Sequence, residues 1–182
     1  MNLSGFILKI FGWKTVYNVE EPSKSVICLA PHTSNWDFVL GKLCFWSMNK
    51  EADFLMKKSW FFFPLGYLLK AMGGIPIDRS QKQSTVKQMV DIFNSSKKLH
   101  LAITPEGTRQ RNEKWKLGFY YIASGAQVPI QLAYIDYKKK EMGISELFYP
   151  SGNEKEDLKH IFDFYRKDYH PKFPERFVIP EI

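Results

Sequence analysis

The sequence has 182 residues, of which 45% are hydrophobic and 25% are charged, a balance that fits one folded domain and excludes wholesale disorder. Its 26 Lys and Arg against 19 Asp and Glu give a net charge of +7, and 16% of the residues are aromatic. A basic, aromatic chain is expected to meet an anionic partner, such as a nucleic acid or a membrane with acidic headgroups. Two cysteines, Cys28 and Cys44, exclude a disulfide framework and are predicted to be buried free thiols.

The first segment, residues 1–14, places Phe6, Ile7, Ile10 and Phe11 at helical spacing. This pattern predicts a short helix that either lies in a membrane interface or packs on the core of its own domain. The segment has no early basic region and no small-residue cleavage site, so it is not interpreted as a signal peptide. The longest apolar stretches fall short of the roughly 20 residues that a membrane-spanning helix needs.

Predicted strands and helices alternate along the rest of the chain. Short apolar runs predict strands at 25–30, 53–57, 75–77, 99–104 and 128–135. Apolar residues at helical spacing predict helices at about 35–48, 80–98, 117–126 and 158–165. The three lysines at 138–140 are interpreted as a solvated turn. This alternation predicts a single α/β domain over residues 1–182, with a largely parallel central sheet flanked by helices.

A histidine and an aspartate follow the strand at 25–30, in the segment PHTSNWD at 31–37. On one helix His32 and Asp37 would lie about 140° apart, so His32 is expected to precede the helix, with Ser34 or Asn35 as the N-cap. His32 can then fold back onto Asp37, whose carboxylate would orient the imidazole while its second nitrogen takes a proton. A local hydrogen bond or a helix cap is the alternative.

Two further segments place cations just after predicted strands. In TPEGTR, at 104–109, Gly107 allows backbone amides to approach a ligand, Arg109 offers a planar group suited to phosphate, and Glu106 could hold a cation. An ordinary turn with a surface ion pair is the alternative. Arg79 ends the segment GGIPIDR, at 73–79, as a second strand-end cation or as a solvated surface charge.

In combination, the blocks H-x4-D, G-x-I-P-I-D-R, P-E-G-T-R and V-P-I, in this order, resemble the lysophospholipid acyltransferase family. Its best-known members are the 1-acylglycerol-3-phosphate acyltransferases, and the resemblance runs from about residue 28 to residue 135. It implies an O-acyltransferase that moves an acyl group from acyl-CoA or acyl carrier protein (acyl-ACP) to the hydroxyl of a lysophospholipid-type acceptor such as 1-acylglycerol-3-phosphate. The thioester would be a co-substrate, and no cofactor or metal is expected.

The resemblance also implies roles for particular residues. His32 would match the family's general base and Asp37 the residue that orients it. Four residues would match the block associated with the acceptor's phosphate: Glu106, Gly107, Thr108 and Arg109. Arg79 would match the arginine of the middle block. Lys57 is a further candidate phosphate contact by analogy, with Lys58 beside it as the other possibility.

The chain departs from the family pattern in three places. Pro31 stands where many members have Asn, and Trp36 and Phe38 add bulk beside Asp37. Only 31 residues precede His32, which favours peripheral attachment at the cytoplasmic, inner face of a membrane over integral attachment. Residues 1–14 and 60–72 would make the contact. The apolar residues of 60–72 either line an acyl groove, dip into the interface or form domain core.

Other functions stay open at this point. The acceptor could be a lipid without phosphate, such as an amino-acid lipid, or water could replace it, which would make the protein a thioesterase. A catalytically inert membrane-binding module would explain the charge and the aromatics but not the ordered motifs. A nucleic-acid binder is not expected, because Lys and Arg are spread along the chain and no recognised nucleic-acid motif occurs.

Overall fold

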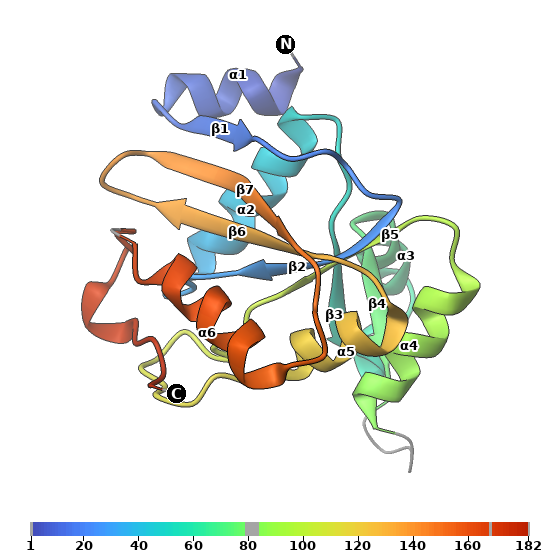
Figure 1. Cartoon of the computed structure of the whole chain (residues 1–182). Helices are drawn as coiled ribbons and strands as arrows, with labels where there is room; N and C mark the ends of the chain where they lie inside the picture. Colours follow the sequence, from blue (N-terminus) through green and yellow to red (C-terminus); the bar gives the residue numbers. More distant parts are fainter. Residues whose placement is uncertain (1, 79–83, 168, 182) are drawn as a thin grey trace.

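A mostly parallel sheet runs through the centre of the molecule, in the order β1-β7-β6-β2-β5-β3-β4 (Figure 1). The computed structural model describes residues 2–78, 84–167 and 169–181. Within them the strands are β1 (Lys14–Tyr17), β2 (Lys24–Leu29), β3 (Asp53–Lys57), β4 (Gly74–Ile77), β5 (Leu99–Ile103), β6 (Ile130–Asp136) and β7 (Glu141–Phe148). The helices are α1 (Leu3–Ile10), α2 (Asn35–Ser47), α3 (Leu65–Ala71), α4 (Thr85–Ser95), α5 (Gly118–Ala126) and α6 (Glu154–Tyr165). Two 3₁₀ turns, η1 (Lys58–Trp60) and η2 (Pro174–Arg176), complete the set. The α/β class and the largely parallel sheet are thus confirmed.

Five strands, β2 to β6, run in the same direction, because β2 pairs in parallel with β5 and β6 and β3 pairs in parallel with β4 and β5. β7 is antiparallel to β6, and β1 is parallel to β7. The carboxyl ends of β2 to β6 therefore meet at one edge of the sheet. In open α/β sheets this edge is where ligands bind.

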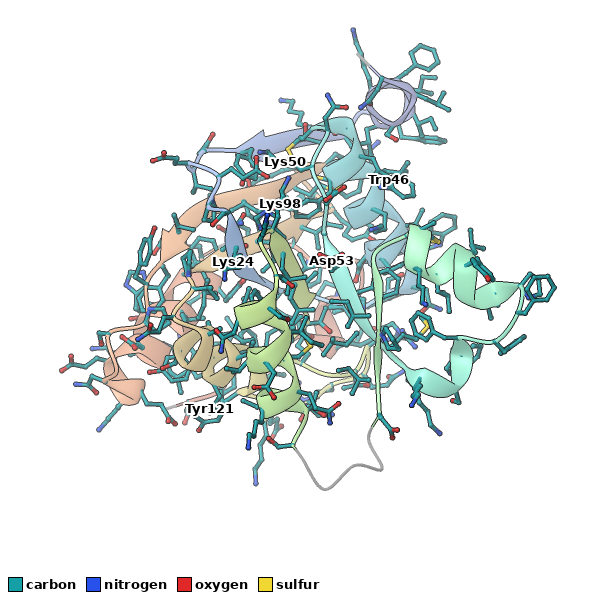
Figure 2. The ribbon with its side chains drawn as sticks, turned by 90° about the vertical axis from the view of Figure 1, so that its right-hand side faces the viewer. Lys24, Trp46, Lys50, Asp53, Lys98 and Tyr121 are labelled. Atoms are coloured by element: carbon teal, nitrogen blue, oxygen red, sulfur yellow. The ribbon has the colours of Figure 1, made fainter. Side chains whose placement is uncertain are left out.

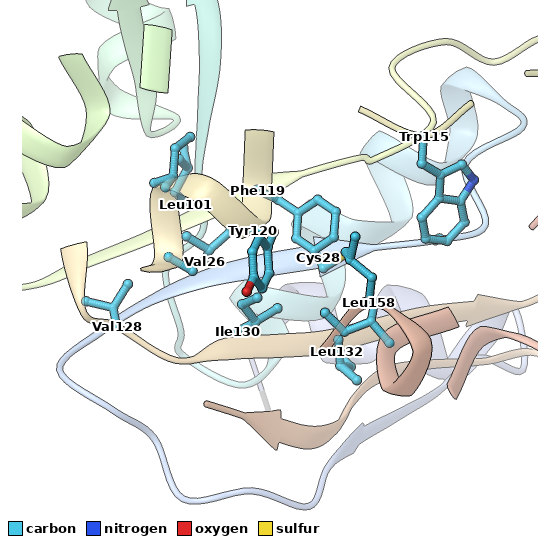
Figure 3. Close-up of a cluster of buried hydrophobic side chains, with 14 of the residues drawn as sticks. Val26, Cys28, Leu101, Trp115, Phe119, Tyr120, Val128, Ile130, Leu132 and Leu158 are labelled. Atoms are coloured by element: carbon cyan, nitrogen blue, oxygen red, sulfur yellow. The ribbon is translucent and has the colours of Figure 1, made fainter. Parts of the chain in front are cut away.

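Side chains from β2 alternate between two hydrophobic layers. Val26 and Cys28 belong to the larger cluster, which α4, α5 and α6 cover and which includes Phe119 and Leu132 (Figure 3). Ile27 points to the other face, where the layer includes residues of α2 such as Phe45. Both cysteines are free and buried, as predicted. The sheet is therefore covered on both faces, which explains why β2 is apolar from Val26 to Leu29.

The short N-terminal helix α1 packs on α2 through one side of its surface. Leu8 is buried in a small cluster with Cys44 of α2 and Met142 of β7. The opposite side of the α1 segment, which includes Phe6, Ile10 and Phe11, is exposed. None of the described helices is long and apolar enough to cross a membrane.

Residues 60–72 do not form a buried core segment. Leu69 is buried, but Phe62, Phe63, Tyr67 and Leu68 are exposed. For these four side chains the interpretation as domain core is therefore wrong, and a surface role remains.

Candidate active site

The two main sequence motifs leave the sheet from adjacent strands. β2 and β5 pair directly, with Cys28 opposite Ile103. The segment that contains His32 follows β2, and the segment that contains Glu106 follows β5, so the two lie side by side at the carboxyl edge of the sheet. Topology therefore joins motifs that are more than 70 residues apart in the sequence.

His32 lies against Asp37, as the sequence predicts. Nδ1 of the imidazole is 3.3 Å from Oδ2 of Asp37, and the two side chains are 12% and 1% exposed. Among the described residues, Nδ1 makes no aligned hydrogen bond, so the contact is a close approach of carboxylate and ring. No protein hydrogen bond in the described part of the chain uses Nε2. This nitrogen can take a proton from a hydroxyl placed beside it.

The start of α2 explains why Asp37 faces His32. Ser34 is the N-cap of the helix, and its hydroxyl accepts a hydrogen bond from the Trp36 N–H at 3.2 Å. Asp37 is the third helical residue, and its Oδ2 accepts the backbone N–H groups of Thr33 and Ser34, each at 2.8 Å. This capping box turns the carboxylate back towards the residues that precede the helix. Asp37 is thus both a helix cap and the partner of His32, so the two interpretations of the motif hold together.

Glu106 supports the backbone of His32 rather than a cation. Its Oε1 accepts the His32 N–H at 2.5 Å, and the residue is 2% exposed. No bond joins Glu106 to Arg109 within the described residues. Burial raises the pKa of Glu106 to about 8, with a further contribution from the Asp37 carboxylate, while the hydrogen bond from His32 opposes the rise. The residue therefore fixes the loop that carries the histidine, from a position closed to solvent.

The loop after Glu106 is turned outward at Gly107, whose φ of +66° lies in the left-handed region. The side chain of Lys116 passes over this glycine, because a Cβ there would lie 2.8 Å from its Cδ and Cε. Thr108 accepts the Gln110 N–H through its hydroxyl at 3.2 Å, and Arg109 is exposed. Lys116 is thus a cation of this loop that the sequence motif did not indicate.

The remaining predicted cations lie along the neighbouring strand ends. Lys57 is the exposed last residue of β3. Lys58, the alternative beside it, has its Nζ 3.6 Å from Oδ2 of Asp78. Arg79 lies outside the described residues. The strand order places Lys57 on the β5 side of the site, two strands from β2.

Residues from the last third of the chain complete the site, and the sequence analysis missed them. The Tyr137 hydroxyl donates to Oδ1 of Asp37 at 2.5 Å. In the C-terminal segment, the Phe173 N–H donates to the Thr33 hydroxyl at 3.2 Å, and Nη1 of Arg176 lies 3.4 Å from the Thr33 carbonyl. None of these residues belongs to a motif. The only available signal for Tyr137 was its place two residues after the end of the predicted strand at 128–135.

A serine–histidine pair, separate from His32 and Asp37, lies at the opposite, amino edge of the sheet. Oγ of Ser25 is 2.9 Å from Nδ1 of His100, and Nε2 of His100 is 3.7 Å from Glu21. Ser25 is fully buried, so a substrate has no access to this hydroxyl. Burial lowers the pKa of His100. The positive charges of Lys50 and Lys98, both labelled in Figure 2, help to lower the pKa of Glu21. The pair is therefore part of the protein's interior and not a nucleophilic site.

Comparison with known families decides the class of the protein. The family model described as acyltransferase matches residues 14–135, about two thirds of the chain. The chain belongs to the acyltransferase family. Neither a curated protein nor a solved structure matches it. The family is that of the 1-acylglycerol-3-phosphate acyltransferases, so the resemblance stated from the motifs is confirmed and the protein is an O-acyltransferase.

The matched range of this acyltransferase contains every site residue that the sequence analysis named. It ends two residues before Tyr137 and does not include the C-terminal segment that contacts Thr33. The environment of His32 and Asp37 is therefore built in part by residues beyond the matched region. No group of three possible metal-ligating side chains occurs in the described residues of the acyltransferase.

Proposed function

We propose that this acyltransferase moves an acyl group from an acyl thioester, either acyl-CoA or acyl-ACP, to the hydroxyl of a lysophospholipid-type acceptor such as 1-acylglycerol-3-phosphate. The observation that carries the proposal is the 3.3 Å approach of His32 Nδ1 to the buried Asp37 carboxylate. This contact leaves Nε2 as the nitrogen available to an acceptor hydroxyl. The reaction would take place at the cytoplasmic, inner face of a membrane, from a peripheral position.

His32 is the general base in this proposal. Its Nε2 takes the proton of the acceptor hydroxyl while the oxygen attacks the thioester carbonyl. The tetrahedral intermediate collapses to an ester, and the thiolate leaves with the proton that His32 received. Asp37 stabilises the imidazolium that exists between these two steps. Because the acceptor supplies the nucleophile, no acyl-enzyme forms.

The loop at 106–109 is proposed to hold the acceptor's phosphate. Arg109 is exposed beside the outward turn at Gly107, and the side chain of Lys116 crosses the same turn. Lys57 lies on the same side of the sheet, and Arg79 joins this set by analogy with the family. Two guanidinium and two ammonium groups suit a phosphate dianion. Glu106 contributes by holding the backbone of this loop against His32.

A membrane surface fits the distribution of exposed apolar side chains. α2 contacts both α1 and the segment at 60–72, since Asn2 donates to the Trp46 carbonyl and Lys42 donates to the Met72 carbonyl. We call the exposed apolar residues of these three segments the apolar surface: Leu3, Phe6, Ile10, Phe11, Trp36, Phe38, Val39, Trp46, Trp60, Phe62, Phe63, Tyr67 and Leu68. Exposed lysines lie in or beside the same segments, at positions 9, 57, 58 and 70. A basic apolar surface binds anionic bilayers reversibly.

The test is release of free thiol from a long-chain acyl-CoA, with and without lysophosphatidic acid in detergent micelles. We expect release that depends on the acceptor and falls at least about 100-fold in His32→Ala, the lower range for loss of a general base. His160→Ala, at an exposed histidine beside Glu146, is the matched control and should keep full activity. Release without an acceptor would instead indicate a thioesterase. Full activity of His32→Ala would refute the base assignment.

If no acyl-CoA is consumed, the same assay is repeated with acyl-ACP and with a total lipid extract as acceptor. Turnover of acyl-ACP would identify the donor, and turnover only with the extract would indicate a different acceptor. Absence of turnover with every pair, together with binding to liposomes, would refute the proposed reaction and favour an inert membrane-binding protein.

A further inference from the structure

Asp37 is held through both of its oxygens, by different parts of the chain. Oδ2 accepts the Thr33 and Ser34 amides, and it is this oxygen that approaches His32. Oδ1 accepts the Tyr137 hydroxyl at 2.5 Å. The backbone amides come from the turn before α2, whereas Tyr137 comes directly after β6. The carboxylate is therefore fixed from two directions.

The two sets of donors do different things. The Ser34 amide on Oδ2 belongs to the capping box and the Thr33 amide directly precedes it, so both hydrogen bonds form locally wherever α2 begins with this sequence. They bind one oxygen only, so the plane of the carboxylate can still tilt about that oxygen. The bond from Tyr137 fixes the position of the second oxygen and so sets the plane. The plane matters because it decides how Oδ2 meets Nδ1 of His32.

Tyr137 is itself fixed before it reaches Asp37. Its backbone N–H donates to the His170 carbonyl at 2.8 Å, and its ring packs edge-on against Trp13, with the centroids 5.2 Å apart. Burial, followed by the hydrogen bond to Asp37 and the charge of that carboxylate, raises the pKa of the Tyr137 phenol far above its usual value. The hydroxyl therefore keeps its proton and stays a donor at any physiological pH.

We propose that Tyr137 is a positioning residue that holds the Asp37 side chain in the orientation that faces His32. The proposal rests on the proposed function in one respect, since it takes His32 as the base. Tyr137 does not touch the reacting atoms and acts through Asp37. Tyr137 lies outside the range matched by the acyltransferase family. The hydrogen bond to Asp37 therefore comes from the segment that follows the matched part of β6.

The first test needs no substrate. The pKa of His32 is measured by NMR from its imidazole proton, which is assigned by its absence in His32→Gln. In the described part of the chain, three titratable or charged groups contact His32 or the adjacent Thr33: Asp37 at the imidazole, Glu106 at the His32 N–H and Arg176 at the Thr33 carbonyl. In Tyr137→Phe the carboxylate loses its set plane and stabilises the imidazolium less well, so we expect the pKa of His32 to fall. An unchanged or raised value would overturn the positioning role.

The second test is the steady-state kinetics of the full-length variant with the donor and acceptor established for the wild type. We expect kcat to fall about 10-fold in Tyr137→Phe, with KM little changed, since the hydrogen bond serves the base and not substrate binding. A rise in KM at constant kcat would overturn the proposal. If the wild type itself proves inactive, the proposed function fails, while the NMR titration still decides the role of Tyr137.

Tyr134→Phe is the matched control. Tyr134 lies on β6, and its hydroxyl donates to the Glu141 carboxylate at 2.6 Å. Its loss removes the same kind of bond from the strand that leads into Tyr137, without touching Asp37. We expect Tyr134→Phe to change neither the pKa of His32 nor kcat. Equal effects of the two variants would show a general loss of structure and overturn the proposal.

Discussion

Glu106 shows how one side chain joins the two motifs of the site. The sequence indicated a carboxylate that would hold a cation, whereas the structure has it accepting the backbone N–H of His32 from a buried position. A carboxylate in such surroundings costs free energy when it ionises. Its protonation is therefore linked to the stability of the fold.

The linkage has a definite sign. The pKa of Glu106 is about 8 in the folded protein, against an ordinary value of 4.5, so the folded state keeps a proton that the unfolded state has lost. The stabilisation that this retained proton gives is complete below the unfolded-state pKa of 4.5 and disappears as pH rises through the folded-state pKa of about 8. We predict that the free energy of unfolding of the wild type falls between about pH 5 and 8 relative to Glu106→Gln. Urea unfolding at both ends of this range measures it, and parallel curves for the two proteins would contradict it.

Gly107 is required by its backbone conformation as well as by space. With φ at +66°, an alanine would be strained, and its Cβ would meet the side chain of Lys116. We predict that Gly107→Ala loses about 1–2 kcal/mol of unfolding free energy and raises the KM for the acceptor, because the cations of this loop are displaced. Gly152→Ala is the control: φ is +92° there, and no atom lies within 4 Å of the added Cβ. It should lose stability without changing KM, and equal KM values for both variants would refute the prediction.

At the residue scale the sequence predicted contacts between residues of one local motif. The spacing of His32 and Asp37, with the N-cap between them, predicted their contact, because the capping box is a short-range structure. Tyr137 is 100 residues from Asp37, and its hydrogen bond depends on β6 ending at the same edge as β2. No pattern in the sequence carries that information. The inward role of Glu106 was missed for the same reason.

The first turn of α2 couples the stability of a helix to the base. Asp37 accepts two amides at the helix start and also faces His32. We predict that Ser34→Ala costs about 1 kcal/mol of unfolding free energy, the usual price of a lost N-cap, with less than a 3-fold change in kcat. Asp37→Asn, whose amide oxygen can still accept the two N–H groups, should lose stability to a similar extent but lower kcat about 100-fold or more. Thermal unfolding and thiol release separate the two, and a Ser34→Ala enzyme as inactive as Asp37→Asn would contradict the distinction.

At the element scale, local sequence patterns predicted the central strands of the sheet and the helix that follows β2. β2, β3, β5 and α2 lie within a few residues of their predicted bounds. β1 and β7 were missed. β1 is a four-residue edge strand with two exposed positions, and it exists because β7 offers it a hydrogen-bonded partner. β7 follows the turn at 138–140 and pairs with β6, so both strands depend on tertiary pairing rather than on alternation.

The whole molecule presents its apolar surface through three segments, and Phe63 is its most exposed side chain at 82%. We predict that Phe63→Asp lowers the affinity for anionic vesicles about 10-fold, because most of the transfer free energy of one phenyl ring is lost and a negative charge is added. Tyr149→Asp is the control, since Tyr149 is 65% exposed. It follows β7, which is antiparallel to β6, and so lies at the amino edge of the parallel strands, whereas Phe63 follows β3 at their carboxyl edge. Vesicle co-sedimentation measures both, and equal losses for the two variants would place the contact elsewhere.

Net charge and apolar contact predict different responses of membrane binding to salt. The excess of seven positive charges attracts anionic lipid over a distance that shrinks from about 14 Å near 0.05 M salt to about 4 Å near 0.5 M. Burial of apolar side chains is insensitive to this screening. We therefore predict that binding to anionic vesicles weakens strongly over this range, whereas a residual affinity, equal to that for neutral vesicles, persists and is lower in Phe63→Asp. Binding that vanished entirely at high salt would mean that the charges act alone and that the apolar surface serves another purpose.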